Sequence, residues 1–185
     1  MTAPDTRAAI MTAARLAVQA RGYNALSFRD IASEVGVKSA SVHYHFPTKG
    51  DLAAALVRQY IDDVEAGLAH LLTQSKDPKE LMRRYTGVFR AALENDNRMC
   101  LCGMMAAEFS DIPEGARSEV ERFAKVNIAW LGAVLFPKLE AVAAAQKAQA
   151  ILAAIQGAQL LARGRGDITV FDQAVESYRL AGLFP

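Results

Sequence analysis

The sequence predicts an all-α protein with a small N-terminal head, residues 1–52, and a larger helical body, residues 53–185. Apolar residues recur at helical spacing along almost the whole chain, and no segment shows the sustained apolar–polar alternation of a strand. No hairpin dipeptide separates two apolar runs either. With 185 residues, of which 52% are hydrophobic and 22% are charged, the chain is long enough to bury a substantial core.

The head begins with two predicted helices. The first, over residues 6–21, has an apolar face and ends at Gly22, because glycine is common directly after a helix C-terminus. Ser27 is a favourable N-cap for the second helix, and Asp30 three residues later gives a pattern close to a capping box.

A sharp turn and a short third helix complete the head. Gly36 suits the turn, since glycine adopts a left-handed backbone at little cost. The third helix is expected over residues 39–45 and is ended by Pro47, which cannot continue it.

The body is predicted to contain six helices, separated by segments rich in Asp, Asn, Gly and Pro. Thr48 caps the first of them, and the segment Gly164–Asp167 separates the last two. The expected ranges are 49–72, 78–93, 99–109, 114–136, 139–163 and 168–181.

Helix, glycine turn and helix at the spacing found in the head predict a helix-turn-helix. In that motif the first helix supports the second in the major groove of DNA, where its N-terminal residues meet base edges. A small helical hairpin of an unrelated bundle is the alternative. The candidate DNA-binding residues are Lys38, Ser39, Ala40, Ser41 and His43 at base edges, Ser27, Tyr44 and Lys49 at phosphates, and Arg29 at either a phosphate or a guanine.

Residues 41–52, Ser-Val-His-Tyr-His-Phe-Pro-Thr-Lys-Gly-Asp-Leu, resemble the signature of the TetR family of bacterial transcriptional regulators. The resemblance extends over about residues 6–55. It implies an all-helical homodimer, usually a repressor, that a small-molecule effector releases from double-stranded DNA at a palindromic operator. The same resemblance implies that Ser39 and His43 read bases and that Tyr44 and Lys49 contact phosphates.

Alanine dominates residues 139–163 in the body. Small side chains let helices approach closely, so this segment and residues 168–181 could form a four-helix interface across a two-fold axis. The composition also suits a helix that packs only within one subunit, and the family resemblance favours the dimer. The expected interface residues include Leu152, Ile155 and Leu160.

Residues 99–111 resemble a branch of the family that senses electrophiles and oxidants, the N-ethylmaleimide repressor type. There a cysteine at the position of Cys100 is the sensor, and a helix start beside Arg98 would favour a reactive thiolate. Alternatively, Cys100 and Cys102 are small buried hydrophobes beside methionines. A disulfide between them is not expected, because residues two apart point to different faces of a helix.

The effector cavity is expected among the helices between residues 60 and 163. Its candidate walls are Cys100, aromatic or methionine side chains that would equally suit a plain core, and Asn127, whose amide needs partners if it is buried. The candidates are Tyr85, Phe89, Cys100, Met104, Phe109, Phe123, Asn127 and Trp130, with Tyr60, Met82 and Met105 beside them.

Charge and hydropathy restrict the class of protein. Residues 1–50 carry six basic and three acidic side chains (+3), and the remainder carries 15 and 17 (−2), which suits a DNA-binding head. No apolar run approaches the roughly 18 residues needed to span a bilayer, and the N-terminal residues lack the apolar core of a signal peptide. With only two cysteines, too few for a disulfide framework, we expect a cytoplasmic protein that does not associate with membranes. We also expect no cofactor, and no bound metal, because two cysteines and three histidines offer too few ligands.

Two other classes of function are compatible with parts of the sequence. An enzyme that uses Ser41, His43 and Asp51 is disfavoured, because residues two apart on a helix do not face each other. A redox- or electrophile-sensing adaptor, acting through protein partners without DNA binding, is the alternative function.

Overall fold

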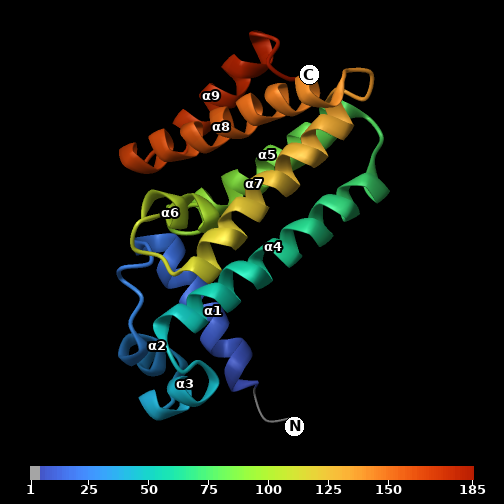
Figure 1. The fold of residues 1–185 in the computed structure, drawn as a ribbon. Helices are drawn as coiled ribbons and strands as arrows, with labels where there is room; N and C mark the ends of the chain where they lie inside the picture. Colours follow the sequence, from blue (N-terminus) through green and yellow to red (C-terminus); the bar gives the residue numbers. More distant parts are fainter. Residues whose placement is uncertain (1–4) are drawn as a thin grey trace. The chain divides into compact units, whose positions relative to one another are not determined.

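In the computed structural model, residues 5–185 are described and form nine helices and no strand (Figure 1). Residues 1–4, which belong to the predicted head and to the N-terminal segment tested for a signal peptide, lie outside the described residues. The predicted all-α fold is confirmed. No helix within residues 5–185 combines the length and the apolar character required to cross a membrane.

By their contacts, the described residues form two compact units. The first unit comprises the chain up to Ile61 together with Leu101–Val120, and the second comprises Asp62–Cys100 and Glu121–Pro185. A functional division at residue 52 stays a prediction. The helices are α1 (Thr6–Arg21), α2 (Phe28–Val35), α3 (Ser39–His45), α4 (Lys49–Gln74), α5 (Pro78–Glu94), α6 (Leu101–Ala107), α7 (Glu114–Leu135), α8 (Ala141–Arg165) and α9 (Thr169–Leu180).

Side-chain caps set where the helices of the first unit begin. The Asp5 carboxylate accepts the N–H groups of Arg7 (3.0 Å) and Ala8 (3.2 Å) at the start of α1. Thr48 and Asp51 form a reciprocal capping box at the start of α4: the Thr48 N–H donates to the Asp51 carboxylate (3.0 Å), and the Asp51 N–H donates to the Thr48 hydroxyl (3.1 Å). Helix α1 then packs against α2, α3 and α6.

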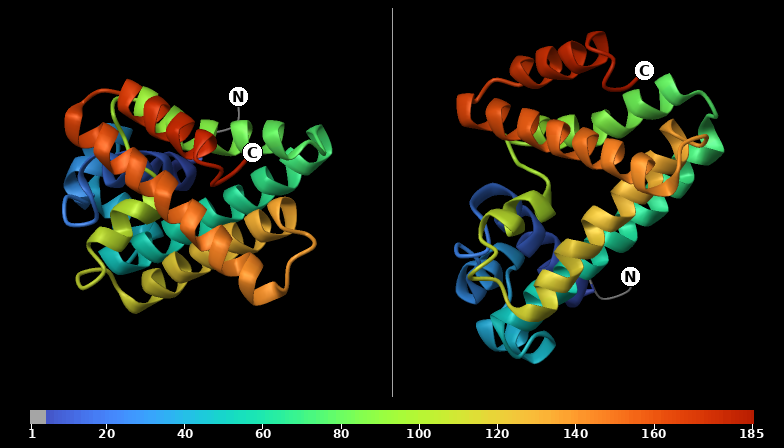
Figure 2. Two further views of the ribbon diagram at one scale, coloured as in Figure 1. Left: turned by 90° about the horizontal axis from the view of Figure 1, so that it is seen from above. Right: turned by 45° about the horizontal axis from the view of Figure 1, so that its top comes forward.

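In the second unit, α8 lies along α5 and α9 folds back beside α8 (Figure 2). The Asp77 carboxylate caps α5 by accepting the Lys79 N–H (3.2 Å), and Pro78 occupies the first turn, where no N–H is needed. The buried apolar side chains of these helices include Leu81, Met82, Phe89, Ile151, Leu152, Ile155 and Phe171.

Two predicted helix ranges need correction. Helix α6 spans only Leu101–Ala107 instead of residues 99–109. Helix α8 does not break at Gly164 but continues to Arg165, because Gly166 is the residue that takes the left-handed conformation, with φ 62° and ψ 25°.

Candidate functional site

The turn between α2 and α3 fixes the orientation of α3. Gly36 ends α2 in the left-handed region, with φ 74° and ψ 31°, and the next N–H, of Val37, donates back to the Ala32 carbonyl (2.9 Å). Ile31 and Ala32 of α2 and Val42 of α3 are buried against the rest of the first unit. This side of α3 is therefore anchored, and its opposite side faces outward.

The outward side of α3 carries most of the predicted base-reading residues. Lys38, Ser39, Ala40 and His43 are exposed, and Ser41 is half-buried. Tyr44 is 84% exposed, which is unusual for a tyrosine in a folded protein. These residues form one polar surface on a short, rigidly held helix.

His43 is held in place from both sides. Its ring lies edge-on to Phe28 of α2, with 4.7 Å between centroids, and its Nδ1 is 3.4 Å from the Pro47 carbonyl oxygen. On α2, the Arg29 side chain is almost fully exposed and lies 3.4 Å from the Asp30 carboxylate. A pair this exposed contributes little to stability, so the Arg29 guanidinium is available to an anion.

Two predicted phosphate contacts already have partners inside the first unit. The Ser27 hydroxyl accepts the Asp30 N–H (3.3 Å) as the N-cap of α2, and its own hydrogen is left to donate. The Lys49 ammonium donates to the Asn24 carbonyl (3.3 Å) and lies 4.2 Å from the centre of the Tyr23 ring. Both side chains are half-buried.

The predicted effector residues divide between the two units, and most of those in the second unit form a buried cluster. The Tyr85 hydroxyl donates to Asn127 Oδ1 (2.8 Å), and Asn127 Nδ2 donates to the Phe123 carbonyl (2.8 Å). The Tyr85 ring stacks on Trp130 at 5.4 Å between centroids and meets Phe89 edge-on, also at 5.4 Å. The amide of Asn127 thus has the partners that its burial requires.

Burial also sets the chemistry of that phenol. It raises the pKa of Tyr85 far above its ordinary value, and the neighbouring Cys100 adds to the rise. The Tyr85 hydroxyl is therefore a neutral hydrogen-bond donor at physiological pH.

Cys100 lies directly before α6 and not inside the helix predicted over residues 99–109, and its side chain is buried, with 3% of the residue exposed. Its N–H donates to Gln159 Oε1 (3.1 Å), and Gln159 Nε2 donates to the Phe89 carbonyl (2.8 Å). Cys100 and Cys102 are thiols and not a disulfide. Gln159 is a residue that sequence reasoning missed, although a glutamine among alanines and leucines is the same kind of signal as Asn127.

Met104 and Phe109 belong to the first unit. Met104 is half-buried, whereas Phe109 is 54% exposed, with the Arg117 guanidinium 5.1 Å from its ring centre. Phe109 follows the end of α6, which is shorter than predicted, so this side chain is on the surface of its unit and does not contribute to its core.

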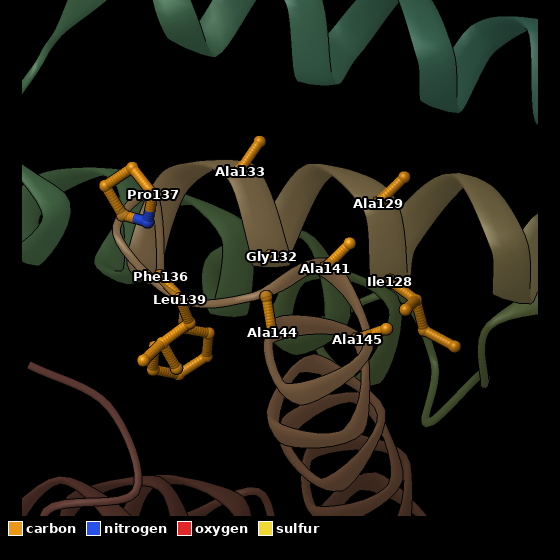
Figure 3. Close-up of a pocket in the computed structure, with 10 residues that line it drawn as sticks. All are labelled: Ile128, Ala129, Gly132, Ala133, Phe136, Pro137, Leu139, Ala141, Ala144 and Ala145. Atoms are coloured by element: carbon orange, nitrogen blue, oxygen red, sulfur yellow. The ribbon is translucent and has the colours of Figure 1, made fainter.

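A hollow of about 320 Å³ lies at the turn between α7 and α8 (Figure 3). None of the predicted effector residues lines it, and its lining side chains are all apolar, so they provide no group to orient a polar ligand. The lining residues are Ile128, Ala129, Gly132, Ala133, Phe136, Pro137, Leu139, Ala141, Ala144 and Ala145.

Comparison with known proteins gives the family. Residues 10–56 match the family described as bacterial regulatory proteins, tetR family. A solved TetR transcriptional regulator from Legionella pneumophila is 31% identical, with 98% of this chain and 99% of that chain covered and a TM-score of 0.90. A TetR-family transcriptional regulator from Agrobacterium tumefaciens is 33% identical, with 93% and 94% covered and a TM-score of 0.85. The chain belongs to the TetR family and is a transcriptional regulator, not an enzyme.

Curated relatives match over a shorter stretch and differ in their effect on transcription. The transcriptional activator FasR of Mycolicibacterium smegmatis is 26% identical over 51% of this chain and 43% of its own length. The repressor KstR2 of the same organism is 31% identical over 40% and 35%. The chain therefore matches less than half of the length of these relatives.

The reduced form of Escherichia coli NemR is similar over 94% of this chain and 95% of that chain, with a TM-score of 0.78 and 21% identity. This likeness is consistent with the resemblance of residues 99–111 to the N-ethylmaleimide repressor type. At this identity it shows the shared fold alone, and the role of Cys100 stays a prediction.

Proposed function

We propose that this protein is a homodimeric repressor that binds a palindromic operator through its two α3 helices and leaves it when a small-molecule effector binds. The observation that carries the proposal is the two-sided character of α3. Val42 is fully buried, while Ser39, His43 and Tyr44 are exposed on the opposite side of the same short helix. A polar helix face that is held rigidly at the surface is what the major groove accommodates.

Each proposed contact follows from side-chain chemistry. Ser39, Ser41 and His43 donate to or accept from base edges, and Ala40 packs on a thymine methyl group. Tyr44 and Ser27 donate to phosphates, as does Lys49 at the positive N-terminal end of α4. Lys38 donates to a base edge, and Arg29 takes a phosphate or a guanine.

The outward face of α8 supports the dimer. Val142 and Leu160 on α8 and Leu180 on α9 are more than half exposed, and the small Ala150 and Ala153 lie between them on α8. A two-fold axis would bury such a face against its own copy.

At the level of residues, the expected interface is corrected. Leu152 and Ile155 are buried within one subunit and pack inside the second unit, so they are not on the outward face. The same holds for Phe171, which lies in the segment 168–181 that was expected to join the interface. The predicted Leu160 is on that face. The partner surface proposed on α8 and α9 is therefore narrower than the whole of residues 139–163 and 168–181.

The cluster around Tyr85 supports an effector site in the body. It combines flat aromatic walls with one neutral hydroxyl and one amide, which together suit a small, mostly apolar molecule with a single polar group. The polar group of such a ligand would take the place of the hydrogen bond between Tyr85 and Asn127. A reactive electrophile at Cys100 is the alternative form of release, and the burial of that thiol means that the reagent must wait for a local opening.

Fluorescence anisotropy on labelled duplex DNA from upstream of the protein's own gene tests the proposal. A shuffled duplex is the control, at one stated salt concentration, because phosphate contacts make affinity depend on salt. We expect specific binding to the upstream duplex. Binding no tighter than to the shuffled duplex, across fragments of the genome, would contradict the proposal and favour an adaptor without an operator.

The same assay with N-ethylmaleimide separates the two modes of release. If Cys100 is the sensor, the reagent abolishes specific binding of the wild-type protein, and Cys100→Ser binds normally but resists release. Release that persists in Cys100→Ser, or binding that survives the reagent in the wild type, would assign release to a non-covalent ligand.

A further inference from the structure

The segment that follows α6 holds the turn between α1 and α2 by its carboxylates. Glu108 accepts the backbone N–H of Asn24 (3.1 Å), and Asp111 accepts Asn24 Nδ2 (2.7 Å). Asn24 thus donates from both its backbone and its side chain to residues 84 and 87 positions away in the sequence. All three residues belong to the first unit.

Gly22 lets this contact form. A Cβ on Gly22 would lie 2.5 Å from Glu108 Oε1, so the carboxylate occupies the space that any other residue would fill. Gly22 also has φ 86°, a conformation that side chains rarely adopt. The Glu108 carboxylate therefore rests directly on the backbone of the turn.

The carboxylate-bearing segment is itself fixed. The Arg117 guanidinium donates to the carbonyls of Ser110 and Ile112, both at 3.0 Å, and the Asp111 N–H donates to the Glu108 carbonyl (2.9 Å). The side chain of Ile112 is buried. Residues 108–112 are therefore held by their own hydrogen bonds, independently of the turn between α1 and α2, and can act as a rigid support for Asn24.

Asn24 in turn contacts the side chain of Lys49. The carbonyl of Asn24 accepts from the Lys49 ammonium (3.3 Å), while the preceding Tyr23 ring lies under the same ammonium at 4.2 Å. The turn therefore determines both groups that orient the Lys49 side chain. Pro113 of the same segment lies close to the start of α4, since a Cβ added to Gly50 would be 3.4 Å from it.

We infer that Asn24 is a positioning residue for Lys49, and that Glu108 and Asp111 hold Asn24 in place for that purpose. The inference rests on the proposed role of Lys49 as a phosphate contact. It makes the DNA affinity of the head depend on two acidic residues that lie outside residues 1–52 and touch no DNA themselves.

The sign of the effect on DNA binding distinguishes positioning from simple electrostatics. Removing two carboxylates reduces repulsion from DNA, so on charge alone the double variant Glu108→Ala/Asp111→Ala would bind more tightly. If the carboxylates position Lys49, the variant instead binds the operator about three- to tenfold more weakly. Its salt dependence also becomes shallower by about 0.9 in the slope of log K against log salt, the share of one phosphate contact.

Matched variants separate charge from position. Glu108→Gln/Asp111→Asn loses the same two charges but keeps an acceptor oxygen for each Asn24 donor, so its affinity should equal or exceed that of the wild type. Glu114→Ala removes an exposed carboxylate nearby in the chain and should leave the salt slope unchanged. Circular dichroism shows whether the double alanine variant folds. If it does not, Asp111→Ala alone removes the hydrogen bond from Asn24 Nδ2, and the same measurements are made on that variant.

A readout without DNA tests the positioning directly. Acetylation of the full-length protein, followed by mass spectrometry, should show Lys49 modified severalfold faster in the alanine variant, with the exposed Lys38 unchanged as the internal standard. An unchanged rate at Lys49 would overturn the inference even if the protein binds its operator. Faster modification with operator affinity equal to or above that of the wild type would overturn it as well. A wild-type protein that binds no DNA specifically would contradict the proposed function. The acetylation result would still decide whether Asn24, held by Glu108 and Asp111, positions Lys49.

Discussion

The surface of α3 and the interior of the second unit use polar side chains in opposite ways. Around α3, Ser39, His43 and Tyr44 face outward on a helix whose inner side is apolar. In the second unit, Asn127 and Gln159 are 1% and 0% exposed, and each amide makes two hydrogen bonds within the unit. A buried amide costs several kcal/mol unless it is paired, whereas an exposed hydroxyl loses nothing in water.

The comparison suggests a division of tasks between these two regions. Polar groups at α3 are exposed and contribute little to folding, and in the proposed function they meet DNA. Polar groups inside the second unit are needed for its internal cohesion. Substitutions should therefore change either DNA affinity or stability, but not both.

The largest effect is expected from Gln159→Leu. The substitution keeps the volume of the side chain but leaves the Cys100 N–H without its acceptor, so the free energy of unfolding should fall by about 2–4 kcal/mol. Urea unfolding measures it, with Gln74→Leu at the exposed end of α4 as a control that should change stability by less than about 0.5 kcal/mol. Operator affinity well below the melting temperature should be unchanged, and a large loss there would break the comparison.

The reverse pattern is expected from Tyr44→Ala. Losing a hydrogen bond to a phosphate should weaken DNA binding by about 1.5–3 kcal/mol on every sequence, while stability changes by less than about 0.5 kcal/mol. Anisotropy titrations on operator and shuffled duplexes measure it. Ser39→Ala is the matched variant and should weaken only the operator, since it removes a base contact. Affinities for both duplexes that remain unchanged in Tyr44→Ala would show that α3 is not the DNA-binding helix.

A pH dependence should come from Tyr85. Because its pKa is raised by burial, its contribution to stability is complete below the ordinary value of 10.0 and is lost as the pH rises through the folded-state pKa. The free energy of unfolding should fall by about 1.4 kcal/mol per pH unit above about pH 10. Urea unfolding between pH 9 and 11 measures the slope.

Tyr85→Phe is the control for this slope. It should remove the Tyr85 part of the slope and leave the smaller part due to Tyr23, whose pKa is raised by burial and by Asp111. An identical slope in Tyr85→Phe would mean that the phenol titrates normally in the folded protein.

The smallest effect is expected at two glycines that share an open environment. No atom would contact a Cβ on Gly36 or on Gly67 within 4 Å, but only Gly36 has a positive φ. Gly36→Ala should therefore destabilise the protein by about 1 kcal/mol, and Gly67→Ala in α4 should stabilise it by about 0.5–1 kcal/mol. Thermal unfolding of both variants measures the difference, and a shift of the same sign in both would contradict the role given to the left-handed turn.

The helix bounds in the head could be predicted from the sequence alone, because they depend on residues next to each helix end. Helices α1 and α3 have the predicted bounds, because Gly22, Gly36 and Pro47 act on the backbone beside them and need no distant partner. The helix-turn-helix prediction also placed Lys38, Ser39, Ala40, His43 and Tyr44 on the exposed side of α3, where the structure has them. The resemblance of residues 41–52 then pointed to the family, to which the chain was found to belong.

Local pattern was insufficient where two faces of a helix look alike. On α8, alanine lies both inside, at Ala144 and Ala148, and outside, at Ala150 and Ala153. The sequence therefore did not distinguish the buried Leu152 from the exposed Leu160. The inward face was decided by packing on α5 and α9.

Polar pairs between distant parts of the chain were decided only by the tertiary structure. Gln159 meets Cys100, and Asn24 meets Glu108, across 59 and 84 positions in the sequence. Nothing in the residues around either partner specifies the other, because a hydrogen bond depends on two groups brought together by the packing of whole helices. The sequence alone could therefore predict which side chains of α3 are exposed, but not which residues hold Asn24 and Lys49 in place.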